Sequence, residues 1–84
     1  MFEKAKLELI KHIDWMNRQH KNGDLPRNRT NYGIATVYAK TIREMGHEVD
    51  LRVYGDGDFL VTDGIMIDRE LIIFRKNIGG EKCT

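Results

Sequence analysis

The second half of the chain carries a cluster of acidic side chains, the residue type that binds hard cations. Five of them lie between positions 56 and 70: Asp56, Asp58, Asp63, Asp68 and Glu70. The Asp-x-Asp spacing at the start suggests a calcium loop, but such a loop needs another oxygen ligand where Leu60 stands. We therefore interpret these acids as turn formers, because Asp bonds to its own backbone and tolerates left-handed geometry.

A magnesium-dependent nuclease site requires an Asp on one strand and a Glu-x-Lys motif on the next, and the nearest match is incomplete. Asp63 is followed by Glu70, but Ile72 occupies the position of the Lys. A small metal-dependent enzyme that uses Asp56, Asp58 and Asp63 is therefore the least favoured of three functional interpretations.

Other catalytic and metal sites also lack members. His12 and His20 stand eight residues apart on one expected helix, too far apart to share a transition metal, and His20 is expected to bond the last carbonyls of that helix. The chain has no Ser, and Cys83 has no evident His partner. The sequence predicts no catalytic residue, no metal ligand and no cofactor.

The first expected helix, from Phe2 to about His20, carries two stripes of side chains. The apolar residues with helical spacing share a face that we expect to be buried: Phe2, Ala5, Leu9, Ile13 and Met16. Leu7 and Trp15 lie outside this face, beside Lys11. An exposed Trp flanked by basic side chains can anchor a protein partner. The alternative is that Trp15 covers the edge of a thin core.

Basic and amide side chains crowd the stretch from Asn22 to Asn31, which contains the only Pro and is expected to be a loop. Arg and Asn are the residues that bind phosphates and base edges. The predicted nucleic-acid-binding set comprises Arg18, Lys21, Arg27, Arg29, Lys40 and Arg43. The alternative is a solvated connection between helices.

A second helix is predicted from about Tyr32 to Met45. Thr30 or Asn31 is expected to cap its start, and Gly46 to end it in a left-handed conformation. The face expected to be buried comprises Ile34, Val37, Tyr38, Thr41, Ile42 and Met45.

The hydrophobic period then changes to that of strands. Four short strands are predicted: Val49–Val53, Phe59–Thr62, Ile65–Ile67 and Leu71–Phe74. The turns between them are Gly55–Asp58, Asp63–Gly64 and Asp68–Glu70, and the Asp-Gly pair favours a hairpin turn with positive φ at both positions. The predicted class is α+β, with two amphipathic helices packed on an antiparallel β-meander of three to four strands.

The length of 84 residues limits the chain to one domain, which we place at residues 1–76, followed by a flexible tail at 77–84. Apolar runs are too short for a membrane span, and one Cys forms no intrachain disulfide, so the expected compartment is the cytoplasm.

The 14 Lys and Arg nearly balance the 13 Asp and Glu, which argues against a globally basic nucleic-acid binder. The balance is uneven along the chain. Residues 1–43 hold nine basic and four acidic side chains, whereas residues 44–70 hold two basic and eight acidic ones. The charge therefore runs from basic to acidic, unless the fold interleaves the two segments.

The favoured function is that of a small non-enzymatic protein that docks on a protein partner, such as a phage- or mobile-element-encoded inhibitor of a host system. The predicted partner-binding set is Leu7, Lys11, Trp15, Asp56, Asp58 and Asp63. The first alternative is a DNA-binding regulator that uses the basic set. A homodimer is compatible with each function, through the last strand or the first helix, because a chain this short gains core by pairing.

Overall fold

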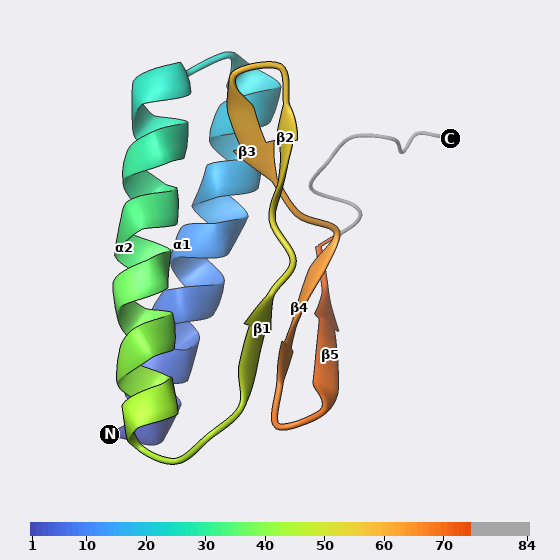
Figure 1. The fold of residues 1–84 in the computed structure, drawn as a ribbon. Coiled ribbons are helices and arrows are strands. Elements are labelled where there is room, and N and C mark those ends of the chain that lie inside the picture. The colour runs from blue at the N-terminus through green and yellow to red at the C-terminus, as the bar shows by residue number, and fades with distance from the viewer. Residues whose placement is uncertain (75–84) are drawn as a thin grey trace.

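The computed structural model describes residues 1–74 and has two layers. Two long helices form an antiparallel pair, and the strands cover one face of that pair (Figure 1). The predicted α+β class is confirmed. The predicted flexible tail, residues 77–84, lies outside the described residues.

Helix α1 spans Phe2–Asn22 and buries the face that its periodicity predicts. Leu9, Ile13 and Met16 are fully buried in the core. The helix ends at Gly23, whose φ of 74° is left-handed and whose N–H donates to the carbonyl of His20.

Helix α2 spans Leu25–Glu44 and begins well before the predicted start at Tyr32. Asp24 caps it by accepting a hydrogen bond from the Arg27 N–H, and Pro26 occupies the first turn, where a missing N–H costs nothing. The predicted long loop is therefore wrong, and only residues 23–24 connect the helices.

The predicted N-terminal caps of this helix are also wrong, whereas Gly46 follows its last turn with the positive φ expected, 96°, and donates its N–H to the carbonyl of Arg43. Thr30 and Asn31 lie inside it, and their side chains donate to carbonyls one turn back, those of Pro26 and Arg27. Turn-forming residue types therefore occur in a helix here because tertiary contacts outweigh their local preference.

The buried face of α2 agrees with the prediction at Ile42, and Tyr38 is partly buried, but the rest of the face differs. The residues facing α1 and the strands are Ala35, Ala39 and Ile42, with Asn28 and Asn31. Small alanines allow the two helices to approach closely. Ile34, Val37 and Met45, which the spacing also predicts to be buried, are exposed.

Five strands form two antiparallel sheets in place of one meander. The strands are β1 (Val49–Leu51), β2 (Tyr54–Asp56), β3 (Phe59–Val61), β4 (Gly64–Ile67) and β5 (Glu70–Ile73). One sheet has the order β1-β4-β5, and β2 and β3 pair with each other. In the sequence, the β2–β3 hairpin lies between β1 and β4, which pair directly with each other in the larger sheet. In space, the hairpin lies against the helix ends that meet at residues 23–24 (Figure 1).

The predicted Asp63–Gly64 hairpin is wrong, since β3 does not pair with β4 and neither residue has a positive φ. Turns occur within the predicted ranges Gly55–Asp58 and Asp68–Glu70 but are shorter, at residues 57–58 and 68–69, because Gly55 and Asp56 belong to β2 and Glu70 belongs to β5. Gly57 adopts a φ of 65°, and Asp68 and Arg69 adopt 51° and 70°. Positive φ at both central residues is the geometry that joins tight hairpins.

Two buried asparagines take the place of a neighbouring strand along β3. The Asn28 amide donates to the carbonyl of Leu60 at 2.8 Å, and its oxygen accepts from the Leu60 N–H at 2.9 Å. Asn17 makes the same pair of bonds with Thr62, at 3.0 and 3.1 Å. The two asparagine side chains therefore satisfy main-chain N–H and C=O groups at the edge of β3 that does not pair with β2, and so attach the hairpin to the helices.

Neither helix of residues 1–74 combines the length and the apolar character that crossing a membrane requires.

Gly33 lies exposed in the middle of α2, with ordinary helical φ and nothing within 4 Å of the Cβ that an alanine would add. We expect Gly33→Ala to raise the free energy of unfolding by about 0.5–1 kcal/mol, because alanine restricts the unfolded chain and favours helix. Urea denaturation of both proteins measures the difference. A loss of stability would mean that this position is not regular helix.

Candidate functional site

Both helices expose large apolar side chains. Leu7 is 64% exposed, Trp15 is 41% exposed and Val37 is 62% exposed. The predicted stripe on α1 therefore lies on the surface. Lys11 joins it, with its ammonium 5.3 Å from the centre of the Trp15 ring and 3.0 Å from the Glu8 carboxylate.

An aromatic row continues from Trp15 to the second helix. The Trp15 and His12 rings meet edge to face at 5.3 Å, and His12 stacks on Tyr38 with ring centres 5.9 Å apart. His12 is buried, and its Nδ1 lies 2.8 Å from the carbonyl of Glu8, so this nitrogen donates. The row fixes Trp15 relative to α2.

A hollow of about 200 Å³ lies beside this row, between the first turns of α1 and the last turns of α2. Its lining residues are Met1, Lys4, Ala5, Tyr38, Thr41 and Met45. Tyr38 belongs to both the row and the hollow. The sequence does not predict the contribution of α2, because the spacing of its apolar residues predicts that Tyr38 and Met45 are buried. The four-residue spacing of Ala35 and Ala39 before Ile42 is the signal that identifies the true contact face.

The acidic half of the predicted partner-binding set lies elsewhere. The Asp56 carboxylate is 2.6 Å from His20 Nε2, and the main-chain oxygen of Asp58 accepts from the Arg29 guanidinium at 2.9 Å. His20 therefore bonds a strand residue and not the helix carbonyls expected. These residues lie on the β2–β3 hairpin, which packs against the buried side of the helices. The structure thus separates the predicted set into two surfaces.

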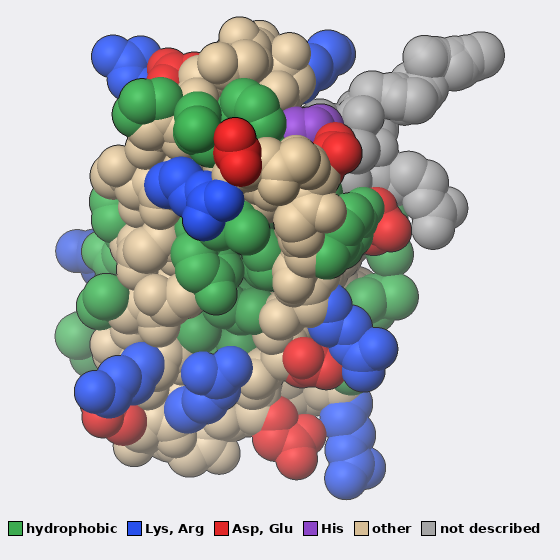
Figure 2. Space-filling model, turned by 45° about the horizontal axis from the view of Figure 1, so that its top comes forward, with side chains coloured by type: hydrophobic (Ala, Val, Ile, Leu, Met, Phe, Trp, Pro, Cys, Tyr) green, Lys and Arg blue, Asp and Glu red, His purple; other side chains and the backbone are tan. Residues whose placement is uncertain are grey.

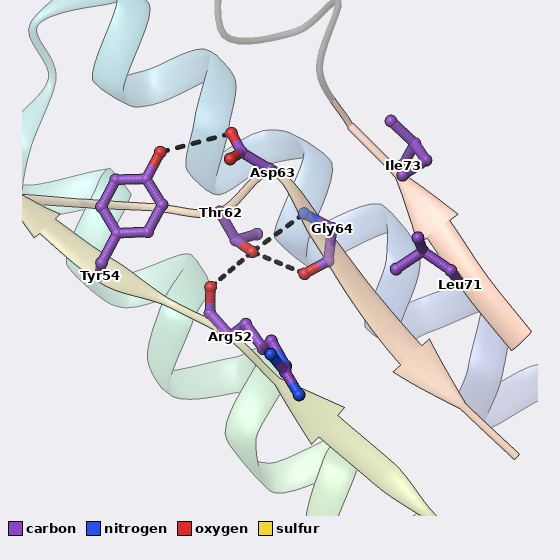
Figure 3. A pocket seen from close by; sticks show the side chains of 7 residues that line it. All are labelled: Arg52, Tyr54, Thr62, Asp63, Gly64, Leu71 and Ile73. Atoms are coloured by element: carbon purple, nitrogen blue, oxygen red, sulfur yellow. Dashed lines mark hydrogen bonds between the residues drawn. The ribbon is translucent and has the colours of Figure 1, made fainter. Parts of the chain in front are cut away.

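Asp63 borders a second hollow, of about 340 Å³, on the outer side of the strands. Figure 3 shows Gly64 between Leu71 and Ile73 on one side and Tyr54 and Asp63 on the other. The Tyr54 hydroxyl donates to the Asp63 carboxylate at 3.4 Å. Burial raises the pKa of Tyr54, and the nearby Asp63 charge raises it further, so the hydroxyl remains a donor.

The predicted nucleic-acid-binding residues are largely occupied by acceptors of the chain itself. Arg29 and Arg43 donate to main-chain oxygens of the strand segment, and Arg18 and Arg27 form ion pairs one turn away on their helices. Lys40 lies 13 residues after Arg27 on α2, about 20 Å along the axis. Nucleic-acid binding through this set stays a prediction.

The fold interleaves the basic and acidic segments. Lys6 pairs with Glu70 at 3.7 Å, and His47 lies 2.7 Å from the Asp68 carboxylate. The Glu48 backbone N–H, followed by the His47 side chain, lowers the pKa of Asp68. Figure 2 shows Lys and Arg side chains interspersed with Asp and Glu around a central apolar area. On this face of the molecule, the uneven charge of the sequence therefore does not become a strongly charged half.

Within residues 1–74, no three His, Cys, Asp or Glu side chains gather into a group that could hold a metal ion. Comparison with known protein families, with curated proteins and with solved structures finds no match for the chain. The candidate site is therefore the stripe of Leu7, Lys11 and Trp15 on α1 together with Tyr38 of α2, which His12 links to Trp15; we call this surface the helix face.

Proposed function

We propose that this chain is a non-enzymatic protein that docks on a protein partner through the helix face. The observation that supports this most is Trp15, a large aromatic ring that stays 41% exposed while neighbours hold it in place. Trp and Tyr dominate binding energy at protein interfaces, because they bury much area and lose little conformational freedom. Trp15 and Tyr38 thus supply two fixed anchors.

The hollow beside Tyr38 can accept an apolar side chain of the partner. Met1 and Met45 on its rim are flexible and adapt to different shapes. Lys4 on the same rim and Lys11 over the Trp15 ring carry positive charge. The partner surface that fits has a protruding apolar residue with acidic residues around it, because such charges guide encounter and specificity.

A protein of this kind acts by occupying a surface that its partner needs for another contact. The chain is short, and the sequence supplies no complete catalytic set. This combination is typical of an inhibitor or adaptor, and we propose a phage or mobile-element origin with a host protein as the target.

The test compares partner capture by wild-type protein and Trp15→Ala from a bacterial lysate, followed by affinity measurement with the purified partner. We expect Trp15→Ala to weaken binding about 100-fold, because it removes a central aromatic anchor. Leu7→Ala on the same stripe is expected to weaken binding less.

The matched control is Arg69→Ala, which removes an exposed side chain at the β4–β5 turn, away from the helix face. It is expected to leave affinity unchanged. Equal capture by wild type, Trp15→Ala and Leu7→Ala would refute docking through the helix face. Circular dichroism confirms that each variant is folded.

A further inference from the structure

Strand β5 forms one edge of the three-stranded sheet, and no strand of residues 1–74 pairs with its outer side (Figure 1). The Phe74 N–H donates to the carbonyl of Asp63 at 2.8 Å. The main-chain N–H and C=O groups of Phe74 therefore point toward the β4 side of the strand. Because N–H and C=O groups alternate in direction along a strand, Ile72 also bonds toward β4, whereas Leu71 and Ile73 direct theirs outward. The edge therefore presents two donors and two acceptors.

The side chains of these two residues are exposed as well. Leu71 is 56% exposed and Ile73 is 49% exposed, and both line the hollow beside Gly64 (Figure 3). Edge strands of soluble proteins usually carry a Lys, a Pro or a bulge that prevents pairing. The sequence of β5, Glu-Leu-Ile-Ile, has no Lys or Pro, and its register with β4 runs without a bulge.

We propose that β5 pairs antiparallel with β5 of a second copy of this chain, with the two-fold axis at Ile72. In this register Leu71 of each copy lies opposite Ile73 of the other. All the outward N–H and C=O groups then pair, which gives four hydrogen bonds across the axis. The two three-stranded sheets become one continuous six-stranded sheet.

A second copy fits this edge because the edge is complementary to itself. The symmetric register places Leu71 beside Ile73 on the outer side and Ile72 beside Ile72 on the inner side. Glu70 lies opposite Phe74 of the other copy, so no like charges meet in the paired segment. The interface is small, and we expect a dissociation constant on the order of 10–1,000 µM.

Sedimentation velocity tests the proposal over a concentration series from about 10 µM to about 2 mM. Wild-type protein is expected to shift from monomer to dimer in this range. Ile73→Pro removes an outward N–H without breaking a bond to β4, and it is expected to weaken the dimer about tenfold or more. The control Ile73→Val keeps the N–H and is expected to dimerise like the wild type.

A second measurement identifies the register. In a Cys83→Ser background, Ile72→Cys places two thiols across the axis at a Cα separation of about 4.5 Å, a distance that suits a disulfide. Mild oxidation is expected to link this variant fully, whereas Val37→Cys at an exposed position of α2 is expected to link poorly.

A wild-type protein that stays monomeric throughout the series would overturn the proposal. So would a dimer that Ile73→Pro leaves intact and Trp15→Ala dissociates, because that dimer uses the helix face. The proposal is independent of the proposed function, since Ile73→Pro leaves the helix face unaltered and is expected to bind the partner normally.

Discussion

Replacing Asn28 by alanine is expected to lower the free energy of unfolding by about 3–5 kcal/mol. The Asn28 side chain is fully buried and makes three hydrogen bonds, one of them to the carbonyl of Met16 at 2.8 Å and two to Leu60. Alanine leaves the N–H and the carbonyl of Leu60 without partners, and each buried unpaired group costs about 1–3 kcal/mol.

The loss is large for a chain of this size. Small domains are stable by about 0.05–0.15 kcal/mol per residue, so the variant loses a substantial part of the total. Urea denaturation measures it. Amide hydrogen exchange adds a local readout, because the Leu60 N–H loses its acceptor and is expected to exchange faster than amides of α1.

Asn31→Ala is the matched control, because Asn31 is also buried on α2 but donates only to the carbonyl of Arg27 in its own helix. It is expected to cost about 1 kcal/mol or less. Asn28→Asp keeps the size and one acceptor but loses both donated bonds, so it is expected to be as unstable as Asn28→Ala. Equal stability of Asn28→Ala and Asn31→Ala would show that the bonds to β3 contribute little.

Gly64→Ala is expected to lower the free energy of unfolding by about 2–3 kcal/mol. The added Cβ would lie 2.7 Å from the main-chain oxygen of Ile72 and 3.4 Å from Leu71 Cδ1. A backbone atom cannot rotate away, so β5 must shift from β4 and weaken the pairing that holds it.

Urea denaturation measures this loss, and amide exchange in β4 and β5 locates it. Gly33→Ala is the matched control, because the same change meets open space there and is expected to stabilise the protein. Unchanged stability of Gly64→Ala would mean that β4 and β5 separate without cost.

The sequence predicts the elements whose pattern is local. The apolar spacing of Leu9, Ile13 and Met16 correctly predicts the buried face of α1, and Gly23 correctly marks its end. Local φ preferences also place the turns at Gly57 and Asp68. These features depend on neighbours within a few residues, so the chain alone determines them.

The start of α2 was missed because its side chains serve distant partners. Asn28 favours a turn by its local preference, but Leu60 and Met16 supply its hydrogen-bond partners. Gly64 follows Asp63 as in a hairpin turn, yet it is required because β5 passes too close for a Cβ. In both cases a contact far along the chain determines the role of the residue.

The candidate site shows the same division. Helical spacing alone placed Leu7, Lys11 and Trp15 on one exposed stripe, and the structure places them on the surface. Tyr38 joins them only through packing, because the alanines of α2 occupy the contact with α1 and Tyr38 stacks on His12 at the edge of that contact.

The sequence by itself determined the α+β class, the first helix and the position of Trp15 outside the buried face of that helix, since each follows from hydrophobic periodicity along the chain. The tertiary structure alone decided which strands pair, which face of α2 is buried and which charges neutralise one another. Those outcomes depend on side chains such as Asn28 and Asp56 meeting partners more than thirty residues away. The periodicity of apolar residues does not predict such long-range contacts, because it depends only on whether each position is apolar and not on which residue that position contacts.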